Sequence, residues 1–140
     1  MSNENIVQEL NIAAKVDNLQ DVLAFVDTVI EEAGCPMKAQ MEIDVAVEEI
    51  FVNIASYAYD ENGGEARMTV CVTEDKEAHI TFYDSGIPYD PLAKEDPDVT
   101  LSAEERQIGG LGIFMTKKLI DDVSYEHTDG FNVLKLVKKF

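Results

Sequence analysis

The sequence predicts an α+β fold, a two-layer sandwich in which a mixed, mostly antiparallel sheet carries its helices on one face. Three observations predict it. Two amphipathic helical stretches follow a short N-terminal strand, two alternating runs come next, and two further alternating runs flank Asp129-Gly130 near the end. The 140 residues have the length of one domain, so 1–140 is expected to be a single unit.

The first strand is expected at residues 6–12, where apolar and polar residues partly alternate. Asp17 with Gln20 three residues later has the pattern of a capping box and predicts the start of a helix. The apolar residues of this helix recur at intervals of three and four: Leu19, Val22, Leu23, Val26, Val29, Ile30 and Ala33. Gly34 stands where a helix commonly ends with a left-handed residue.

A second helix is expected to open at Pro36, whose missing N–H costs nothing in a first turn. Its core stripe is Ile43, Ala46, Val47, Ile50, Phe51 and Ile54. The pattern fades near Tyr59, and Asn62-Gly63-Gly64 predicts a turn. Residues 68–72 and 80–82 then alternate, which predicts two strands joined by a hairpin at 73–78.

A polar, acidic stretch at residues 89–108 contains two prolines, and a loop of this length is usually functional or mobile. A last helix is expected after Gly112, with apolar residues Ile113, Phe114, Leu119 and Ile120. Two strands at 123–127 and 131–137 are expected to close the chain as a hairpin.

The charge balance is the strongest compositional signal, because 11 basic residues face 28 acidic ones and the net charge is −17. Such a field repels nucleic acid and attracts basic protein surfaces, although solubility alone is a common reason for it. Association with a basic partner is expected to slow as salt rises. Cys35 and Cys71 have no metal spacing, and neither a signal peptide nor an apolar run of about 20 residues is present, so we expect a reduced, cytoplasmic protein that does not span a membrane.

Glu49 and Asn53 form the first pair of candidate functional residues, since their i, i+4 spacing places them on one rim of the second helix. Glu48 falls on the opposite rim and is not expected to share their site. A carboxylate can act as a base, and an amide oxygen can ligate a hard cation such as Mg²⁺. The alternative interpretation is that both side chains are simply exposed to solvent on the helix surface and have no functional role.

Asp84-Ser85-Gly86-Ile87-Pro88 ends a predicted strand. An ionised carboxylate only accepts hydrogen bonds, so Asp84 suits an exocyclic amine such as that of adenine, and Gly86 allows close backbone approach or positive φ. An ordinary turn contains the same residue types.

Gly109-Gly110-Leu111-Gly112 opens the last predicted helix, where exposed N–H groups and the helix dipole can bind an anion. Its glycines have neither the Walker nor the Rossmann spacing. The alternative to an anion-binding site is a flexible hinge or a tight helix start. Arg106 and Lys117 lie nearby in sequence and could help to neutralise a polyphosphate.

Three motifs follow one another along the chain: Glu49-x-x-x-Asn53, Asp84-x-Gly86-x-Pro88 and Gly110-x-Gly112. Together they resemble the GHKL-type (Bergerat) ATP-binding fold of gyrase, Hsp90, histidine kinases and MutL. The similarity runs over about residues 6–138 and is closest to the small anti-sigma-factor serine/threonine kinases of bacteria.

The resemblance implies a role for each motif. Asn53 would coordinate Mg²⁺ and Glu49 would be the catalytic base. Asp84 would bind the adenine amine, with Gly86 beside it. The later residues would contact the phosphates of ATP: Arg106, Gly110, Leu111 and Gly112.

The resemblance also implies the function: an anti-sigma regulator that phosphorylates a serine or threonine on an anti-sigma-factor antagonist, binds a sigma factor and pairs as a homodimer. The chain departs from the family pattern at Tyr57, where histidine is common, at Asn132, where Gly-Thr is usual in the hairpin, and in the spacing of Arg106. The departures at Tyr57 and Asn132 keep open a nucleotide-gated binding module without kinase activity. A detached histidine-kinase catalytic domain is a third, weaker alternative.

Overall fold

The computed structural model describes residues 7–59, 63–88 and 116–140. Its five strands form one sheet in the order β1-β2-β3-β5-β4, and every neighbouring pair is antiparallel. The strands are β1 (Gln8–Ala13), β2 (Glu65–Val72), β3 (Glu77–Asp84), β4 (Asp122–Thr128) and β5 (Phe131–Lys139). The predicted α+β class with a mostly antiparallel sheet is therefore confirmed, and no parallel pair occurs among the described strands.

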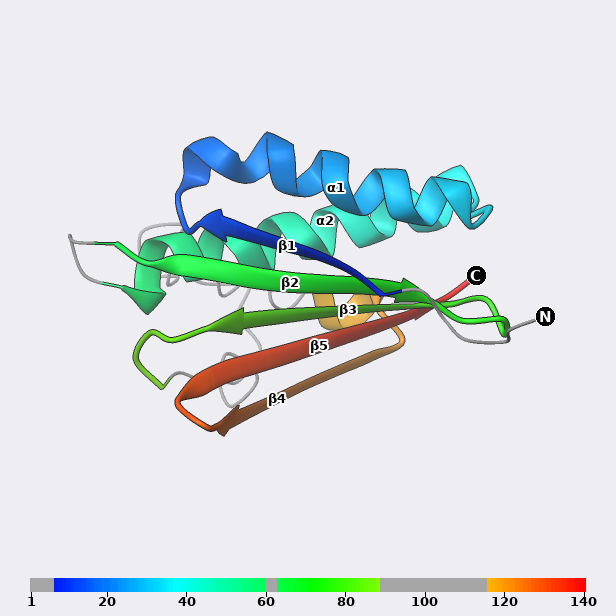
Figure 1. The fold of residues 1–140 in the computed structure, drawn as a ribbon. Helices are drawn as coiled ribbons and strands as arrows, with labels where there is room; N and C mark the ends of the chain where they lie inside the picture. The colour runs from blue at the N-terminus through cyan, green and yellow to red at the C-terminus, as the bar shows by residue number, and fades with distance from the viewer. Residues whose placement is uncertain (1–6, 60–62, 89–115) are drawn as a thin grey trace, which may run out of the picture.

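Two long helices, α1 (Leu19–Glu32) and α2 (Met37–Asn53), lie side by side on one face of this sheet (Figure 1). Residues 116–119 are also helical. The predicted two-layer arrangement is thus confirmed. No helix in the described ranges is both long enough and apolar enough to cross a membrane.

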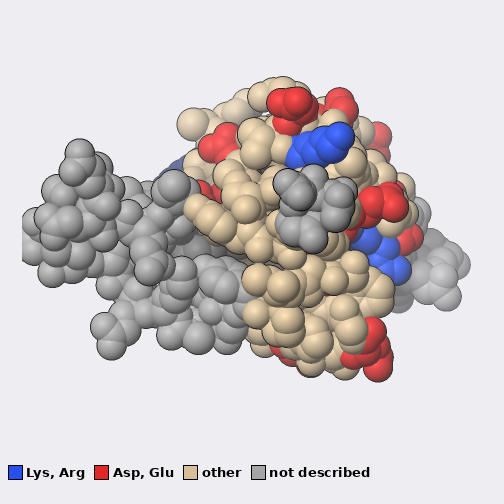
Figure 2. Space-filling view, turned by 90° about the vertical axis from the view of Figure 1, so that its left-hand side faces the viewer, with Lys and Arg blue, Asp and Glu red and all other residues tan. Residues whose placement is uncertain are grey.

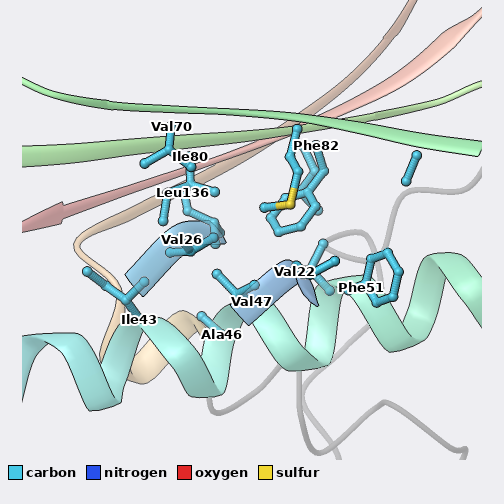
Figure 3. Packing of buried hydrophobic residues seen from close by; sticks show 14 of the residues in the cluster. Val22, Val26, Ile43, Ala46, Val47, Phe51, Val70, Ile80, Phe82 and Leu136 are labelled. Carbon is cyan, nitrogen blue, oxygen red and sulfur yellow. The ribbon is translucent and has the colours of Figure 1, made fainter. Parts of the chain in front are cut away.

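The core lies between the helices and the sheet. Val22 and Val26 of α1 and Val47 of α2 are fully buried against Ile80 and Phe82 of β3 (Figure 3). The predicted core stripe of α2 is buried along its whole length. Truncating a side chain as large as Phe82 to alanine typically costs about 3–5 kcal/mol. This layer therefore holds the ends of α2 and β3 in fixed positions, and those ends carry two of the candidate motifs.

Tight turns form where the sequence predicts them. Gly34 follows α1 with φ of 84°, and Gly34 and Cys35 donate N–H groups to the last carbonyls of the helix. Asp129 and Gly130 have φ of 54° and 83°, the two positive values that a two-residue hairpin turn requires, and they join β4 to β5. This turn fixes the register of β5 against β4.

Both predicted helix starts are displaced. Asp17 does not cap α1, because it lies within a 3₁₀ turn, η1 (Val16–Asn18), and makes no side-chain capping bond. Asn18 instead donates from Nδ2 to the Ala13 carbonyl at 2.9 Å and ties the start of α1 to the end of β1. Pro36 has ψ of 152° and precedes the first turn of α2 rather than forming part of it.

An acidic pair lies where the two helices meet. Asp27 of α1 and Asp44 of α2 are within hydrogen-bond reach, and one oxygen of each is buried without a hydrogen-bond partner. Burial, followed by the hydrogen bond and charge of Asp27 and the charges of Glu31 and Glu48, raises the pKa of Asp44 to about 8. The folded protein therefore keeps a proton here that the unfolded chain, with a pKa of 3.8, releases.

Stability is accordingly expected to fall as pH rises from about 4 to about 8, because only the unfolded state gives up the proton in that window. Asp44→Asn removes this penalty. The variant is expected to be about 1–2 kcal/mol more stable than wild type at pH 8, a value reduced by solvent screening of a partly exposed pair, and to approach wild type near pH 4. Urea unfolding measured across this range tests it, and a constant difference at all pH values contradicts it.

Candidate functional site

A cavity opens where the C-terminal end of α2 meets the end of β3 and the start of β5. Its empty space, counted together with the open solvent at its mouth, is about 450 Å³. The residues that line it are Ile50, Asn53, Ile54, Tyr57, Ala58, Phe82, Asp84, Ile87, Tyr125, Asn132 and Leu134. Figure 2 views this end of the molecule, and the charged side chains lie mainly around the edge of the described surface.

Asp84 occupies the last inward-facing position of β3, following Ala78, Ile80 and Phe82, so its side chain lies on the helix-covered face and is only 6% exposed. Its Oδ1 accepts hydrogen bonds from the Gly86 N–H at 3.0 Å and from Asn132 Nδ2 at 2.9 Å. Oδ2 has no hydrogen-bond partner among the described residues. A carboxylate held in this way retains one oxygen to accept a hydrogen bond from a ligand in the cavity.

Asn132 is the main functional candidate that sequence reasoning missed, since it entered only as a departure from a family pattern. It lies directly opposite Asp84 in the β3–β5 pairing and is 6% exposed. Nδ2 also donates to the Ile87 carbonyl at 2.8 Å, and Oδ1 accepts from the Tyr125 hydroxyl. Asn132 therefore holds the Asp84 carboxylate and the loop after β3 together.

A sequence signal for Asn132 does exist. The alternating run of β5 places Asn132 on the same face as Leu134 and Leu136, so a polar residue occupies a core-facing position. A buried amide needs partners, which indicates a hydrogen-bond network at that place.

The loop after β3 is fixed against η2 (Ile54–Ala58), a π-helical turn that continues α2. The Ile87 N–H donates to the Ala58 carbonyl at 3.0 Å, and the Ser85 N–H donates to the Tyr59 hydroxyl at 2.8 Å. Gly86 lies so close that an added Cβ would be 2.1 Å from the Ala58 carbonyl oxygen. A glycine at this position allows either positive φ or close backbone approach, and the structure supports close backbone approach.

Gly86→Ala is therefore expected to destabilise the protein by about 2 kcal/mol or more, because the loop or η2 must shift to admit the methyl group. Gly34→Ala is the comparison. It has open space around its Cβ but a φ of 84°, and a cost of about 1 kcal/mol is expected from strain alone. Chemical unfolding of both variants tests this, and equal losses contradict the close-approach argument.

Glu49 and Asn53 meet on the last turns of α2, as their spacing predicts. Asn53 Nδ2 donates to Glu49 Oε1 at 3.3 Å, which leaves Asn53 Oδ1, the atom that can ligate a cation, without a partner among the described residues. Burial raises the pKa of Glu49, the Asn53 hydrogen bond opposes this, and the charge of exposed Glu48 adds to the rise. A carboxylate with a raised pKa is better suited to accept a proton.

The structure thus brings Asn53, Asp84 and Asn132 to one cavity, with Glu49 bonded to Asn53 beside it. Tyr57, on η2, also lines it. The predicted phosphate-contacting residues, together with the predicted loop at 89–108, lie outside the described residues: Arg106, Gly110, Leu111 and Gly112. Lys117 lies on the helical segment 116–119 with its side chain exposed.

Comparison with known proteins identifies the fold family. A family model described as a histidine kinase-like ATPase domain matches residues 12–138. The chain belongs to this histidine kinase-like ATPase family. Membership implies that the protein uses ATP, and it agrees with a cavity that offers a buried carboxylate at the end of β3.

Among curated members of this ATPase family, the chain is 27% identical over 130 residues to the serine-protein kinase RsbW of Bacillus cereus strain AH187, covering 90% of this chain and 81% of the relative. It is 30% identical over 111 residues to the serine-protein kinase RsbW of Listeria monocytogenes EGD-e, covering 76% and 70%. The resemblance to anti-sigma serine kinases is therefore confirmed at the level of family.

Two solved structures share the fold of this ATPase-family chain. The RsbU and RsbW domains of Rv1364c from Mycobacterium tuberculosis align with a TM-score of 0.69 at 15% identity, covering 96% of this chain and 32% of that one. The SiaB–SiaC complex from Pseudomonas aeruginosa aligns with a TM-score of 0.67 at 14% identity, covering 96% and 90%. At these identities the likeness supports the fold alone.

Proposed function

We propose that this protein is a magnesium- and ATP-dependent serine/threonine kinase of the anti-sigma type, which phosphorylates an anti-sigma-factor antagonist. The observation that carries the proposal is the cavity that joins Asn53 at the end of α2 to Asp84 at the end of β3. The curated relatives named serine-protein kinase support the reaction class.

Adenine is the part of ATP that the described residues fit best. The cavity is lined largely by apolar side chains, which suit a flat base, and its buried carboxylate is held on one oxygen by Gly86 and Asn132. The other oxygen, Asp84 Oδ2, would accept a hydrogen bond from the exocyclic amine of adenine. A base with a carbonyl oxygen at this position would face a carboxylate, so the site favours adenine over hypoxanthine or guanine.

Magnesium would be held by Asn53 Oδ1 together with the phosphates of the nucleotide, since Mg²⁺ in such sites keeps few protein ligands. The fit rests on the amide orientation, because the bond from Nδ2 to Glu49 leaves Oδ1 for the cation. The metal supplies charge neutralisation for the phosphates, which a chain of net charge −17 particularly needs.

Glu49 would accept the proton of the substrate hydroxyl. Its raised pKa increases its basicity, and its bond to Asn53 fixes it beside the metal site. Arg106, Gly110, Leu111 and Gly112 would contact the phosphates from the segment before the last helix.

A sigma factor, an antagonist and a second copy of the chain are the proposed partners, and the cytoplasm is the proposed compartment. The strong negative charge disfavours direct nucleic-acid binding and favours basic protein surfaces.

Phosphorylation of an antagonist encoded beside this protein, with labelled ATP and mass-spectrometric mapping of the phosphosite, tests the proposal. We expect magnesium-dependent transfer to a serine or threonine of the antagonist. Binding of ATP without transfer to any antagonist would favour the nucleotide-gated module instead. Label on a histidine would favour the detached histidine-kinase domain.

A further inference from the structure

The outer face of α2 carries a stripe of exposed apolar side chains that the nucleotide site does not use. Met37, Met41 and Val45 are 68%, 60% and 45% exposed. Their i, i+4, i+8 spacing places them on one side of the helix, away from the buried residues Ile43 and Ile50 that face the sheet. We call these three residues the α2 stripe.

Exposed large apolar side chains in a regular row are unusual for a helix whose other face already supplies the core. A single exposed methionine needs no explanation, but three residues on successive turns form a continuous strip. Methionine is flexible and polarisable, which suits surfaces that receive a partner helix. The stripe therefore has the form of one half of a helix-in-groove contact.

Acidic residues lie along the α1 side of the α2 stripe, whereas exposed Lys38 lies on its other side. α1 and α2 together carry eight carboxylates and one lysine. Glu48 lies one turn beyond Val45 on the outer face and is exposed, and Asp44 lies beside the stripe on the side of α1. Next to Asp44 come Asp27 and Glu31 of α1, both of which act on its charge.

Of the carboxylates on α1 and α2, Glu42 pairs with Lys138 at 3.3 Å, but the acidic pair between the two helices has no such cation in the described part of the chain. No described basic side chain forms an ion pair with Asp27 or Asp44, and one oxygen of each has no hydrogen-bond partner. Their mutual repulsion helps to raise the pKa of Asp44. A lysine or arginine brought by a partner would favour the charged form of Asp44, which burial and the neighbouring carboxylates otherwise keep protonated, so the acidic margin favours a cationic occupant.

We propose that the α2 stripe, with its acidic margin, is a docking surface for a basic amphipathic helix of a partner protein. Apolar residues of that helix would cover Met37, Met41 and Val45, and its lysines or arginines would face Asp27, Asp44 and Glu48. A second copy of this chain does not fit, because its own α2 stripe would bring the same carboxylates against these. The proposal rests on the proposed function only for the existence of a protein partner.

A model peptide tests the proposal without a natural partner. The probe is a labelled peptide of about 18 residues, five helical turns, made of leucine and lysine with the leucines on one face. Its control has the same composition in scrambled order, so both have the same charge. Fluorescence anisotropy at physiological salt is expected to show the amphipathic peptide binding about tenfold more tightly, since only it can present an apolar face.

The chain offers matched variants. Met37→Ser/Met41→Ser is expected to weaken binding of the amphipathic peptide about tenfold, whereas Val7→Ser/Val16→Ser, which changes two exposed valines outside α1 and α2, is expected to leave it unchanged. Thermal melts of both variants establish that they are folded. Mg-ATP affinity, measured on the same samples, is expected to remain that of wild type, so loss of docking and loss of the nucleotide site are read separately.

Equal binding of the two peptides, or no binding of either, would overturn the proposal, because charge alone or nothing at all would then account for the surface. Equal losses in the methionine and valine variants would also overturn it. A concentration-dependent dimer that Met37→Ser/Met41→Ser abolishes in sedimentation velocity would assign the α2 stripe to a second copy and contradict the charge argument.

Discussion

Asp84→Asn is expected to weaken Mg-ATP binding by about 100-fold, close to 3 kcal/mol. Asp84 Oδ1 already accepts from Gly86 and Asn132, so the amide oxygen of the variant would take those two bonds. Its NH₂ group would then face the exocyclic amine of adenine, which places a donor against a donor. Isothermal titration calorimetry measures the loss directly.

Asp75→Asn is the matched control for this change. Asp75 is exposed in the turn between β2 and β3, at the opposite end of β3 from Asp84, so the same loss of charge is made away from the cavity. Its Mg-ATP affinity is expected to equal that of wild type. If Asp84→Asn stayed within about threefold of wild type, less than 1 kcal/mol, the assignment of Asp84 to adenine recognition would be wrong.

Glu49→Gln is expected to slow phosphoryl transfer by about 10²–10⁴-fold while Mg-ATP affinity stays near that of wild type. Glutamine keeps the size of the side chain and can still bond to Asn53, but it cannot accept the proton of the substrate hydroxyl. Single-turnover transfer to the antagonist and calorimetry separate the two effects. A variant that transfers phosphate at the wild-type rate would exclude Glu49 as the base.

Glu48→Gln is the control for Glu49, since the two residues are neighbours on α2 and Glu48 is exposed. Transfer at neutral pH is expected to persist. Because the charge of Glu48 contributes to the raised pKa of Glu49, its removal lowers that pKa. A base must be ionised to act, so the acidic limb of the pH–rate profile is expected to move to lower pH in Glu48→Gln.

Local sequence patterns predicted the parts of the site that depend on short-range spacing. The period of α2 placed Glu49 and Asn53 on one rim, and their side chains do bond to each other. The alternation of β3 predicted a strand ending near Asp84, and Asp129-Gly130 predicted the hairpin. In each case a few neighbouring residues determine the conformation.

The parts of the candidate site that local sequence patterns did not predict depend on contacts between segments that are distant in the sequence. Asn132 bonds to Asp84, 48 residues away, and this contact follows from the pairing of β3 with β5 rather than from either local sequence. The constraint on Gly86 comes from the Ala58 carbonyl in the same way. Asp17 shows the opposite error. The local sequence has a capping pattern, but Asp17 lies within a 3₁₀ turn and does not cap α1.

A crystal structure with magnesium and a non-hydrolysable ATP analogue tests the central claim most directly. We expect the adenine amine within hydrogen-bond distance of Asp84 Oδ2 and the metal bound by Asn53 Oδ1, with Asn132 still bonded to Asp84. Nucleotide bound elsewhere on the chain, or a cavity at the end of β3 that stays closed to the base, would contradict the account.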